Sequence, residues 1–200
     1  MSQQEFWNKK FSRDGYLYGT KPNQFIKNSY DNFKKSEKVL CLGEGEGRNA
    51  IFLAKNGYDV EAIDASDIGL DKLYEQSILE NVEIKTSCID INNWQPDKKY
   101  GAILFTFMHL QREELKSLLE KIETALKNKG FLVVEVFAKS QLERNSGGPK
   151  DLELLYSMDD FRDNIKNLKI HKLEEVTVEL DEGKGHQGEA SVIRLIAQKV

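Results

Sequence analysis

In VLCLGEGEGRNAIFLAKNGYDVEAID, residues 39–64, a short apolar run leads into a glycine-rich loop at 43–47. A segment with helix-like apolar residues follows at 48–55, and a second strand-like segment at 58–63 ends at Asp64. Strand, loop, helix and strand in this order predict a parallel crossover unit. The glycine loop is then expected at the carboxyl edge of the sheet, where ligands bind in doubly wound folds.

The alternation of strands and helices continues toward the C-terminus. Right-handed crossovers between parallel strands place helices on both faces of one sheet. Gly130 stands where a chain that leaves a helix needs a left-handed residue. The further expected elements are a helix at 68–79, strands at 82–89 and 100–107, a helix with the apolar stripe Leu115, Leu118, Leu119, Ile122 and Leu126, and a strand at 131–137.

The end of the chain departs from this alternation. Ser157 is expected to cap a helix that runs to residue 165, and the segments 172–180 and 190–197 are expected to form an antiparallel hairpin. The predicted fold class is α/β: a doubly wound, mostly parallel, seven-stranded Rossmann-like sheet with a C-terminal antiparallel hairpin and helices on both faces. We expect a single domain over 1–200, with an N-terminal arm or lid at 1–36 and an α/β core at 37–200.

Composition narrows the class of function. The net charge is -4, and lysines are spread among acids without a basic face, which argues against a nucleic-acid partner. The N-terminus is polar, and no run of about 18 apolar residues exists, so neither a signal peptide nor a membrane span is expected. Cys41 and Cys88 lie in apolar, strand-like contexts without metal-ligand spacing and are expected to be reduced core residues, with no metal site. A cytoplasmic protein that acts on small molecules is the expectation.

The glycine loop distinguishes between two cofactors. A dinucleotide fingerprint needs glycine or alanine where Arg48 stands, so the pattern here is G-x-G-x-G. Glu44 and Glu46 inside the loop would repel a pyrophosphate but attract the cationic sulfonium and ammonium of S-adenosylmethionine. The loop therefore favours S-adenosylmethionine over NAD, although a glycine loop alone is also compatible with a simple tight turn.

Two carboxylates follow at the ends of the next strands. Asp64, which lies 17 residues after Gly47 because 64 − 47 = 17, can accept hydrogen bonds from both ribose hydroxyls of the cofactor. Its alternative role is a helix cap before Ser66. Asp90 at the end of the third strand can accept a hydrogen bond from the adenine amino group, or it can be a solvated turn residue.

The sequence resembles a known enzyme family along nearly its whole length. VLCLGEGEGRNAIFLAKNGYDVEAIDAS, SCIDINNW and YGAILFTFMHL resemble the four motifs of class I S-adenosylmethionine-dependent methyltransferases. FWNKKFSRDGYLYGTKPNQFI and LKNKGFLVVEVF extend this similarity toward the small tellurite-resistance methyltransferases. The resemblance implies a methyltransferase that uses S-adenosyl-L-methionine.

The resemblance also implies roles for individual residues. It places the glycine loop against the methionine portion of the cofactor, Asp64 on the ribose, and Asp90 with the Ile91 backbone on the adenine. The family usually has an acid two residues before the first glycine, where this chain has Cys41, and we expect Glu44 to supply that carboxylate. The implied cofactor-binding set is Gly43, Glu44, Gly45, Gly47, Arg48, Asn49, Asp64, Ala65, Asp90, Ile91, Phe105 and Thr106.

The acceptor side has fewer signals. Methyl transfer needs a nucleophile held in line with the sulfonium, and a base only if that nucleophile is protonated. His109 and His186 are the candidate bases, each weighed against a structural role, and His171 is assigned no role. Two segments are candidate lids or inert connections: the arm with Trp7, Tyr16 and Tyr18, and the loop 145–150 with Gly147 and Gly148.

The expected partner is a small-molecule methyl acceptor, in particular a thiol or a chalcogen species. This expectation follows because the chain offers little length for an acceptor pocket beyond the cofactor-binding sheet. A non-catalytic S-adenosylmethionine-binding sensor or scaffold is the alternative, and an NAD-dependent oxidoreductase is less favoured. The sequence is compatible with a monomer or a homodimer.

Overall fold

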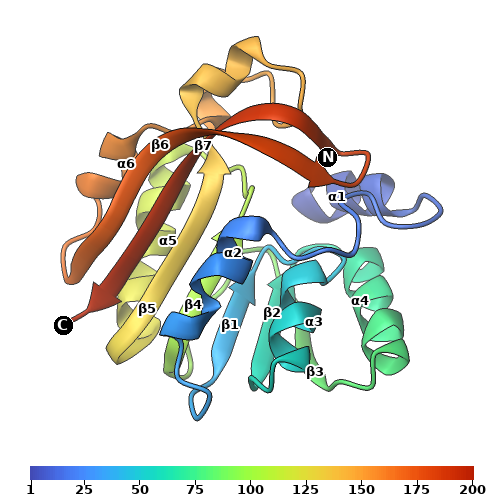
Figure 1. The fold of residues 1–200 in the computed structure, drawn as a ribbon, viewed down its shortest axis with the longest axis horizontal. Coiled ribbons are helices and arrows are strands. Elements are labelled where there is room, and N and C mark those ends of the chain that lie inside the picture. The colour runs from blue at the N-terminus through green and yellow to red at the C-terminus, as the bar shows by residue number, and fades with distance from the viewer.

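The computed structural model describes residues 1–200 and contains one seven-stranded sheet in the order β3-β2-β1-β4-β5-β7-β6 (Figure 1). The strands from β3 to β5 in this order pair in parallel, and β7 pairs antiparallel with both β5 and β6. The predicted fold class is confirmed. The strands are β1 (Val39–Leu42), β2 (Val60–Asp64), β3 (Ile84–Cys88), β4 (Tyr100–Thr106), β5 (Leu126–Phe137), β6 (Leu168–Glu182) and β7 (His186–Lys199).

Helices cover both faces of the sheet. One core cluster of 25 buried residues lies between the sheet and α5 and α6, and a second of 15 lies under α2, α3 and α4. No helix combines the length and the apolar composition needed to cross a membrane. The helices are α1 (Gln3–Phe11), α2 (Gln24–Ser29), α3 (Arg48–Lys55), α4 (Asp67–Leu79), α5 (Arg112–Ala125) and α6 (Met158–Arg162), with short 3-10 helices η1 (Tyr30–Asn32), η2 (Lys139–Glu143) and η3 (Leu152–Leu154).

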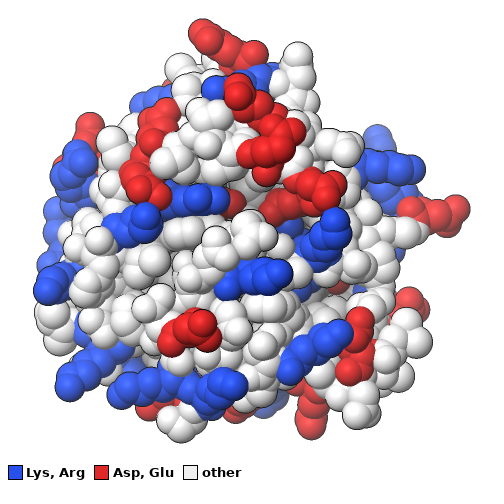
Figure 2. All heavy atoms as spheres, in the orientation of Figure 1, with Lys and Arg blue, Asp and Glu red and all other residues white.

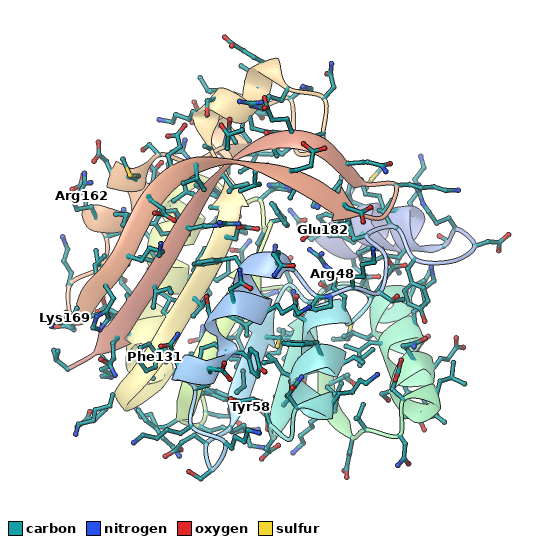
Figure 3. All side chains as sticks on the ribbon, viewed as in Figure 1. Arg48, Tyr58, Phe131, Arg162, Lys169 and Glu182 are labelled. Carbon is teal, nitrogen blue, oxygen red and sulfur yellow. The ribbon has the colours of Figure 1, made fainter.

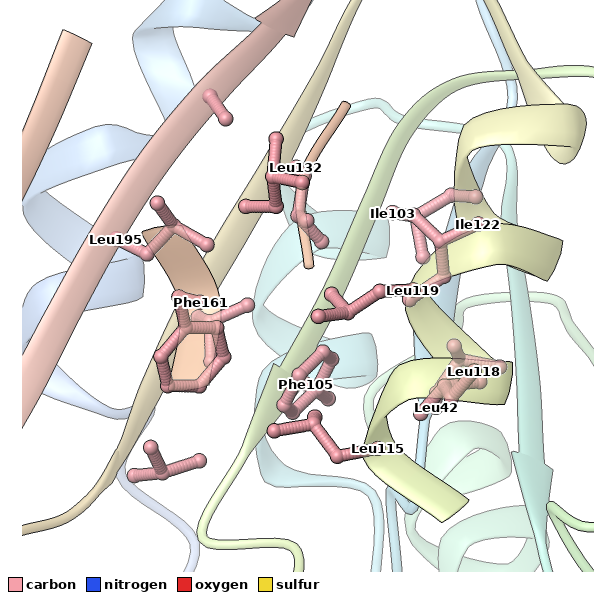
Figure 4. Packing of buried hydrophobic residues seen from close by; sticks show 14 of the residues in the cluster. Leu42, Ile103, Phe105, Leu115, Leu118, Leu119, Ile122, Leu132, Phe161 and Leu195 are labelled. Atoms are coloured by element: carbon pink, nitrogen blue, oxygen red, sulfur yellow. The ribbon is translucent and has the colours of Figure 1, made fainter. Parts of the chain in front are cut away.

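The apolar stripe predicted for α5 is confirmed for Leu115, Leu118, Leu119 and Ile122, whereas Leu126 follows the helix as the first residue of β5. Its leucines and Ile122 are almost fully buried and pack on the sheet beside Ile103 and Phe105 of β4 (Figure 4). At the start of α5 the Gln111 and Glu114 side chains form a reciprocal capping box, which satisfies backbone N–H groups that the helix leaves free. This packing holds the carboxyl end of β4 next to the glycine loop.

The prediction that Gly130 adopts the left-handed conformation is wrong. Lys129 has the positive φ of 65°, and β5 already begins at Leu126, directly after α5. A Cβ added to Gly130 would lie 2.8 Å from the Lys127 carbonyl oxygen and 3.1 Å from that of Gly101. The glycine is therefore needed for the close approach of neighbouring backbones.

The C-terminal hairpin is longer than the sequence predicts. The expected loop at 181–188 is paired almost to its centre, since Glu182 pairs with His186 and only three residues form the turn. Ser157 does cap α6, in a capping box with Asp160, but the helix ends at Arg162 rather than at residue 165. In Figure 1 the hairpin arches across the top of the sheet toward α1, so its tip reaches the carboxyl edge of the sheet.

The hairpin tip contacts the N-terminal arm directly. The Gly185 N–H donates to the Leu17 carbonyl at 3.0 Å, and a Cβ added to Gly183 would lie 2.5 Å from the Gly19 nitrogen. Residues about 165 positions apart in the chain therefore close over the same edge of the sheet.

Candidate active site

The glycine loop between β1 and α3 requires glycine for two physical reasons. Gly43, Gly45 and Gly47 have positive φ values of 60°, 61° and 92°, a conformation that residues with a Cβ rarely adopt. A Cβ on Gly47 would also lie 2.4 Å from Leu73 Cγ in α4, and one on Gly45 would lie 3.0 Å from Phe11 Cζ in α1. The loop is thus held tightly between α4 and α1.

An open pocket of about 860 Å³ adjoins this loop at the carboxyl edge of the sheet. Its walls come from the ends of β1, β2 and β4, from the segment after β3, from α1 and from the start of β7. The site residues predicted from the sequence that line it are Gly43, Glu44, Gly45, Arg48, Asn49, Asp64, Ala65, Asp90, Ile91, Thr106, Trp7, Tyr18, His109 and His186.

Five of the predicted site residues lie outside this pocket. Gly47 faces α4, and Phe105 is buried in the core between the sheet and α5. The Tyr16 hydroxyl donates to Gln76 Oε1 of α4 at 3.2 Å, which turns the ring away from the pocket. Gly147 and Gly148 line a second, adjoining pocket instead.

Several pocket residues were missed by the sequence reasoning. Phe11 stacks on Trp7 with ring centroids 5.5 Å apart, and Phe107 has a positive φ of 51°, which redirects the chain at the end of β4. Phe11 and Trp7 are spaced i, i+4 on α1, which is the only sequence signal for this aromatic pair. The other residues of this group are Gln3, Ile63, Ile89, Asn92, Met108 and Leu110.

Asp64 holds the loop and still has capacity for a ligand. Its Oδ2 accepts the Gly45 N–H and its Oδ1 accepts the Ser66 N–H, each at 2.8 Å. Each carboxylate oxygen has two lone pairs, so one per oxygen remains for a ribose hydroxyl. Burial raises the pKa of Asp64 to about 6. The cap of α4 is Ser66, whose Oγ accepts the Gly69 N–H, so Asp64 is not the cap.

Glu44 occupies the space beside the cysteine that replaces the usual acid. Its Oε1 accepts the N–H groups of Asn49 and Ala50 at 2.8 Å, which satisfies the first turn of α3. Burial raises the pKa of Glu44 to about 7. Cys41 is fully buried, and burial together with the neighbouring Glu44 raises the pKa of its thiol. Glu44 therefore brings a carboxylate to the pocket wall that Cys41 cannot supply. The expectation that Cys88 is also a core residue is wrong, because Cys88 is exposed at the end of the edge strand β3.

The N-terminal arm is tied to the sheet edge by polar contacts. Asn8 donates to Asp67 Oδ1 at 2.7 Å and accepts the Ser66 hydroxyl at 2.6 Å. Glu46, in the glycine loop, accepts the Leu17 N–H at 2.7 Å and pairs with Lys72 of α4 at 2.9 Å. These contacts hold α1 across the pocket, with Trp7 and Phe11 facing it.

A buried polar network joins the hairpin to α3. Glu182 pairs through Oε2 with Arg48 Nη2 at 2.9 Å and with His186 Nδ1 at 3.3 Å, while its Oε1 accepts the Asn23 amide at 3.0 Å. Although burial alone would raise it, the pKa of Glu182 is lowered to about 2 by these partners. Asn23 also donates to Glu135, which pairs with Arg194 at 2.6 Å.

The two histidines of the pocket are both weak bases. Burial, followed by the charges of His186 and Lys10, lowers the pKa of His109 to about 3, and its Nδ1 is buried without a partner. Burial also lowers the pKa of His186, whose ring lies 4.4 Å from those of Tyr18 and Phe107. Both imidazoles are therefore neutral near pH 7.

The second pocket opens beside the first and shares four residues with it: Gln3, Trp7, Tyr18 and His109. Among its lining residues the charged side chains are those of Lys10 and Arg13, and no acid lines it. The candidate lid loop forms its other wall. A Cβ on Gly147 would lie 2.5 Å from His186 Cδ2, so this loop packs directly on the hairpin.

Residues 5–194 match the model of the family described as tellurite resistance protein TehB. The chain belongs to this family. Over 88 residues, 43% of the chain, it is 38% identical to the probable S-adenosyl-L-methionine-dependent methyltransferase TehB of Haemophilus influenzae (strain 10810). That match spans 31%, about a third, of the curated relative's length. The resemblance found in the sequence is thus confirmed at the level of the family.

Solved structures show the same fold at low sequence identity. TehB from Haemophilus influenzae superposes with a TM-score of 0.73 at 22% identity, over 100% of this chain and 68% of that one. The N-methyltransferase NodS from Bradyrhizobium japonicum WM9, in complex with S-adenosyl-l-homocysteine, superposes with a TM-score of 0.75 at 11% identity. The match covers 100% of this chain and 99% of NodS. A third structure is described as the conversion of a disulfide bond into a thioacetal group during echinomycin biosynthesis. It superposes with a TM-score of 0.80 at 12% identity, over 99% of this chain and 92% of that one.

Proposed function

We propose that this chain is an S-adenosylmethionine-dependent methyltransferase that acts on a small-molecule nucleophile. The observation that carries the proposal is the charge of the pocket wall: three carboxylates, Glu44, Asp64 and Asp90, face a single permanent cation, Arg48. Such a wall favours a ligand with a sulfonium and an ammonium over one with a pyrophosphate. The family and its named relatives support the same cofactor.

The residues of the pocket fit the parts of this cofactor. Gly43 and Gly45 bring bare backbone to the pocket wall, which suits the methionine portion, and Asp64 has free lone pairs for the ribose hydroxyls. Ile89, Asp90 and Ile91 line the wall after β3 and suit the adenine. When bound, the cofactor supplies an electrophilic methyl group. The chain's own groups then orient the two reactants and exclude water.

For the acceptor we propose a thiol or another chalcogen nucleophile that enters ionised. His109 and His186 are neutral and weakly basic, so they suit hydrogen bonding to a nucleophile better than removal of its proton. Lys10 and Arg13 in the second pocket lower the free energy of an anion that approaches there. The structural relative from echinomycin biosynthesis is described in terms of sulfur chemistry, which supports this choice.

The charge distribution outside the pocket does not favour a nucleic-acid partner. On the face shown in Figure 2, basic side chains lie among acidic and uncharged ones, whereas nucleic-acid binding favours a continuous basic area. The cytoplasmic location and the monomeric or homodimeric state stay predictions.

The test is a methyl-transfer assay with S-adenosylmethionine carrying a tritiated methyl group. A small alkyl thiol, selenite with excess reductant, and a small primary amine are compared at equal concentration and at pH 7.5. We expect methylated product from the thiol or from reduced selenium, and at least about a hundredfold less from the amine, because neither pocket histidine is basic enough to remove the proton of an ammonium. Faster transfer to the amine, or no transfer to any acceptor, contradicts the proposal.

A further inference from the structure

Arg48 is a charged residue in an almost fully buried position. It is the first residue of α3, directly after the glycine loop, and only 8% of its surface is exposed. Its side chain lines the pocket and extends toward the hairpin, where Nη2 pairs with Glu182 (Figure 3). Glu182 is itself held by His186 and Asn23, so the guanidinium lies in a defined orientation.

The pairing with Glu182 leaves part of the guanidinium unsatisfied. Arg48 Nη1 is buried and has no hydrogen-bond partner, one of only two such side-chain atoms in the structure. A buried donor without a partner costs about 1–3 kcal/mol, and more when it is charged, so such groups are usually matched by a ligand or by water. Because Arg48 also lines the pocket wall, its guanidinium has hydrogen-bonding capacity left for an anionic group of a pocket ligand.

The charges around Arg48 indicate which group that is. The pocket wall contains three acids but no permanent cation besides Arg48, and its two histidines are neutral because burial lowers their pKa. The methionine portion of the cofactor carries one ammonium and one carboxylate. Glu44 and the other acids suit the ammonium, so Arg48 is the only charged group in the wall that suits the carboxylate.

We propose that the Arg48 guanidinium binds the α-carboxylate of the cofactor's methionine portion, and thereby selects S-adenosylmethionine over its decarboxylated form. This inference rests on the proposed function, because it assumes that the pocket holds this cofactor. Glu182 is a positioning residue in this account, since it holds the guanidinium from the side away from the ligand. The C-terminal hairpin therefore contributes to cofactor selectivity without touching the cofactor.

The test is a cycle of two ligands and two protein variants. Dissociation constants for S-adenosylmethionine and decarboxylated S-adenosylmethionine are measured by calorimetry on the wild-type chain and on Arg48→Met. The decarboxylated ligand keeps the sulfonium, the ammonium and the adenosine, so only the carboxylate differs. Arg194→Met is the matched control, because Arg194 belongs to the same buried network, pairs with Glu135 and does not line the pocket.

We expect the wild-type chain to prefer S-adenosylmethionine by about 10- to 150-fold, the factor that a hydrogen bond to a charged group contributes. In Arg48→Met this preference falls to within about threefold of unity or inverts, because the buried Glu182 then repels the carboxylate. Arg194→Met keeps the wild-type preference. If Arg48→Met does not fold, Arg48→Gln replaces it with the same expectation.

Each contrary result has a distinct meaning. A wild-type chain without preference, or an Arg48→Met chain that keeps it, overturns the inference while the proposed function stands. Unchanged cofactor binding in Arg48→Met with a raised KM for the acceptor also overturns it, since Arg48 would then bind an anionic acceptor. A wild-type chain that binds neither ligand overturns the proposed function itself.

Discussion

The two walls of the pocket are built in different ways. The wall proposed to bind the cofactor, called the cofactor wall and formed by residues 43–45 with Asp64 and Asp90, comes from residues at or just after the ends of strands of the parallel sheet. The arm-and-hairpin wall, formed by α1, Tyr18 and the start of β7, combines the two ends of the chain. The first wall depends on local turns, and the second depends on contacts between distant segments.

This difference separates two kinds of expected mutational effect. Changes in the cofactor wall remove groups that face the ligand and act on cofactor affinity. Changes in the arm-and-hairpin wall act through packing and through the neutral His186. They are therefore expected to alter turnover less than changes in the cofactor wall alter cofactor affinity. The following variants test this contrast, beginning with the loop.

Gly45→Val is expected to abolish measurable cofactor binding. Gly45 has a φ of 61°, which a β-branched residue resists, and its Cβ would contact Phe11 at 3.0 Å beside the ligand space. Gly57→Val is the control, because Gly57 also has a positive φ of 84° but has open space around its Cβ. Calorimetric titration should show binding by the control alone, and retained affinity in Gly45→Val would remove the loop from the site.

Asp64→Ala is expected to weaken cofactor binding by roughly 1.5–3 kcal/mol, or about 10- to 150-fold, through loss of charged acceptors for the ribose hydroxyls. Asp59→Ala, just before the start of β2 and away from the pocket, removes an exposed carboxylate and should leave the dissociation constant unchanged. Circular dichroism checks that both variants are folded. An Asp64→Ala chain that is folded and binds with wild-type affinity contradicts a ribose contact.

Glu44→Gln tests whether this carboxylate replaces the acid absent at Cys41. Glutamine can still accept the two backbone N–H groups of α3, so the change removes mainly the ability of this group, whose pKa is about 7, to ionise beside a bound ammonium. We expect about tenfold weaker binding, in line with loss of one charge-assisted hydrogen bond. Cys41→Ser should change affinity by less than about threefold, since its side chain is fully buried. The reverse ranking of the two variants would show that Glu44 does not take that role.

His109→Ala and His186→Ala are each expected to lower turnover by less than about tenfold, below the 10²–10⁴ range of general bases. Their lowered pKa values and an ionised acceptor make proton removal unimportant. His171→Ala, on the exposed β6, is the control. A loss of several hundredfold in either variant, with cofactor affinity intact, would identify a base and point to a hydroxyl or amine acceptor.

Local patterns were sufficient to predict the sheet and to place the glycine loop, Asp64 and Asp90 together at one edge of it. Apolar runs of strand length, the α5 stripe and the glycine loop each arise from neighbours in sequence, so their placement follows from periodicity and turn chemistry. The end of β2 puts Asp64 beside Gly45 for the same reason. Gly130 was misread because a close backbone approach and a left-handed turn both favour glycine.

The rest of the site depends on long-range contacts that single-sequence patterns do not encode. Phe11 lies over the loop only because Asn8 and Glu46 hold the arm there. The partnership of Arg48 with Glu182 spans 134 positions, since 182 − 48 = 134, and requires a hairpin longer than its alternating pattern indicates. Tyr16 shares the aromatic character of Trp7 but faces α4, a difference set by packing.

Calorimetric titration of the wild-type chain with S-adenosylhomocysteine and, separately, with NAD shows whether the pocket is a site for the adenosyl cofactor or for a dinucleotide. S-adenosylhomocysteine keeps every group that the cofactor wall is proposed to bind except the methyl and its charge. The account predicts saturable binding of one S-adenosylhomocysteine per chain and no binding of NAD at the same concentrations. Binding of NAD, or the absence of binding by S-adenosylhomocysteine to the folded chain, would contradict it.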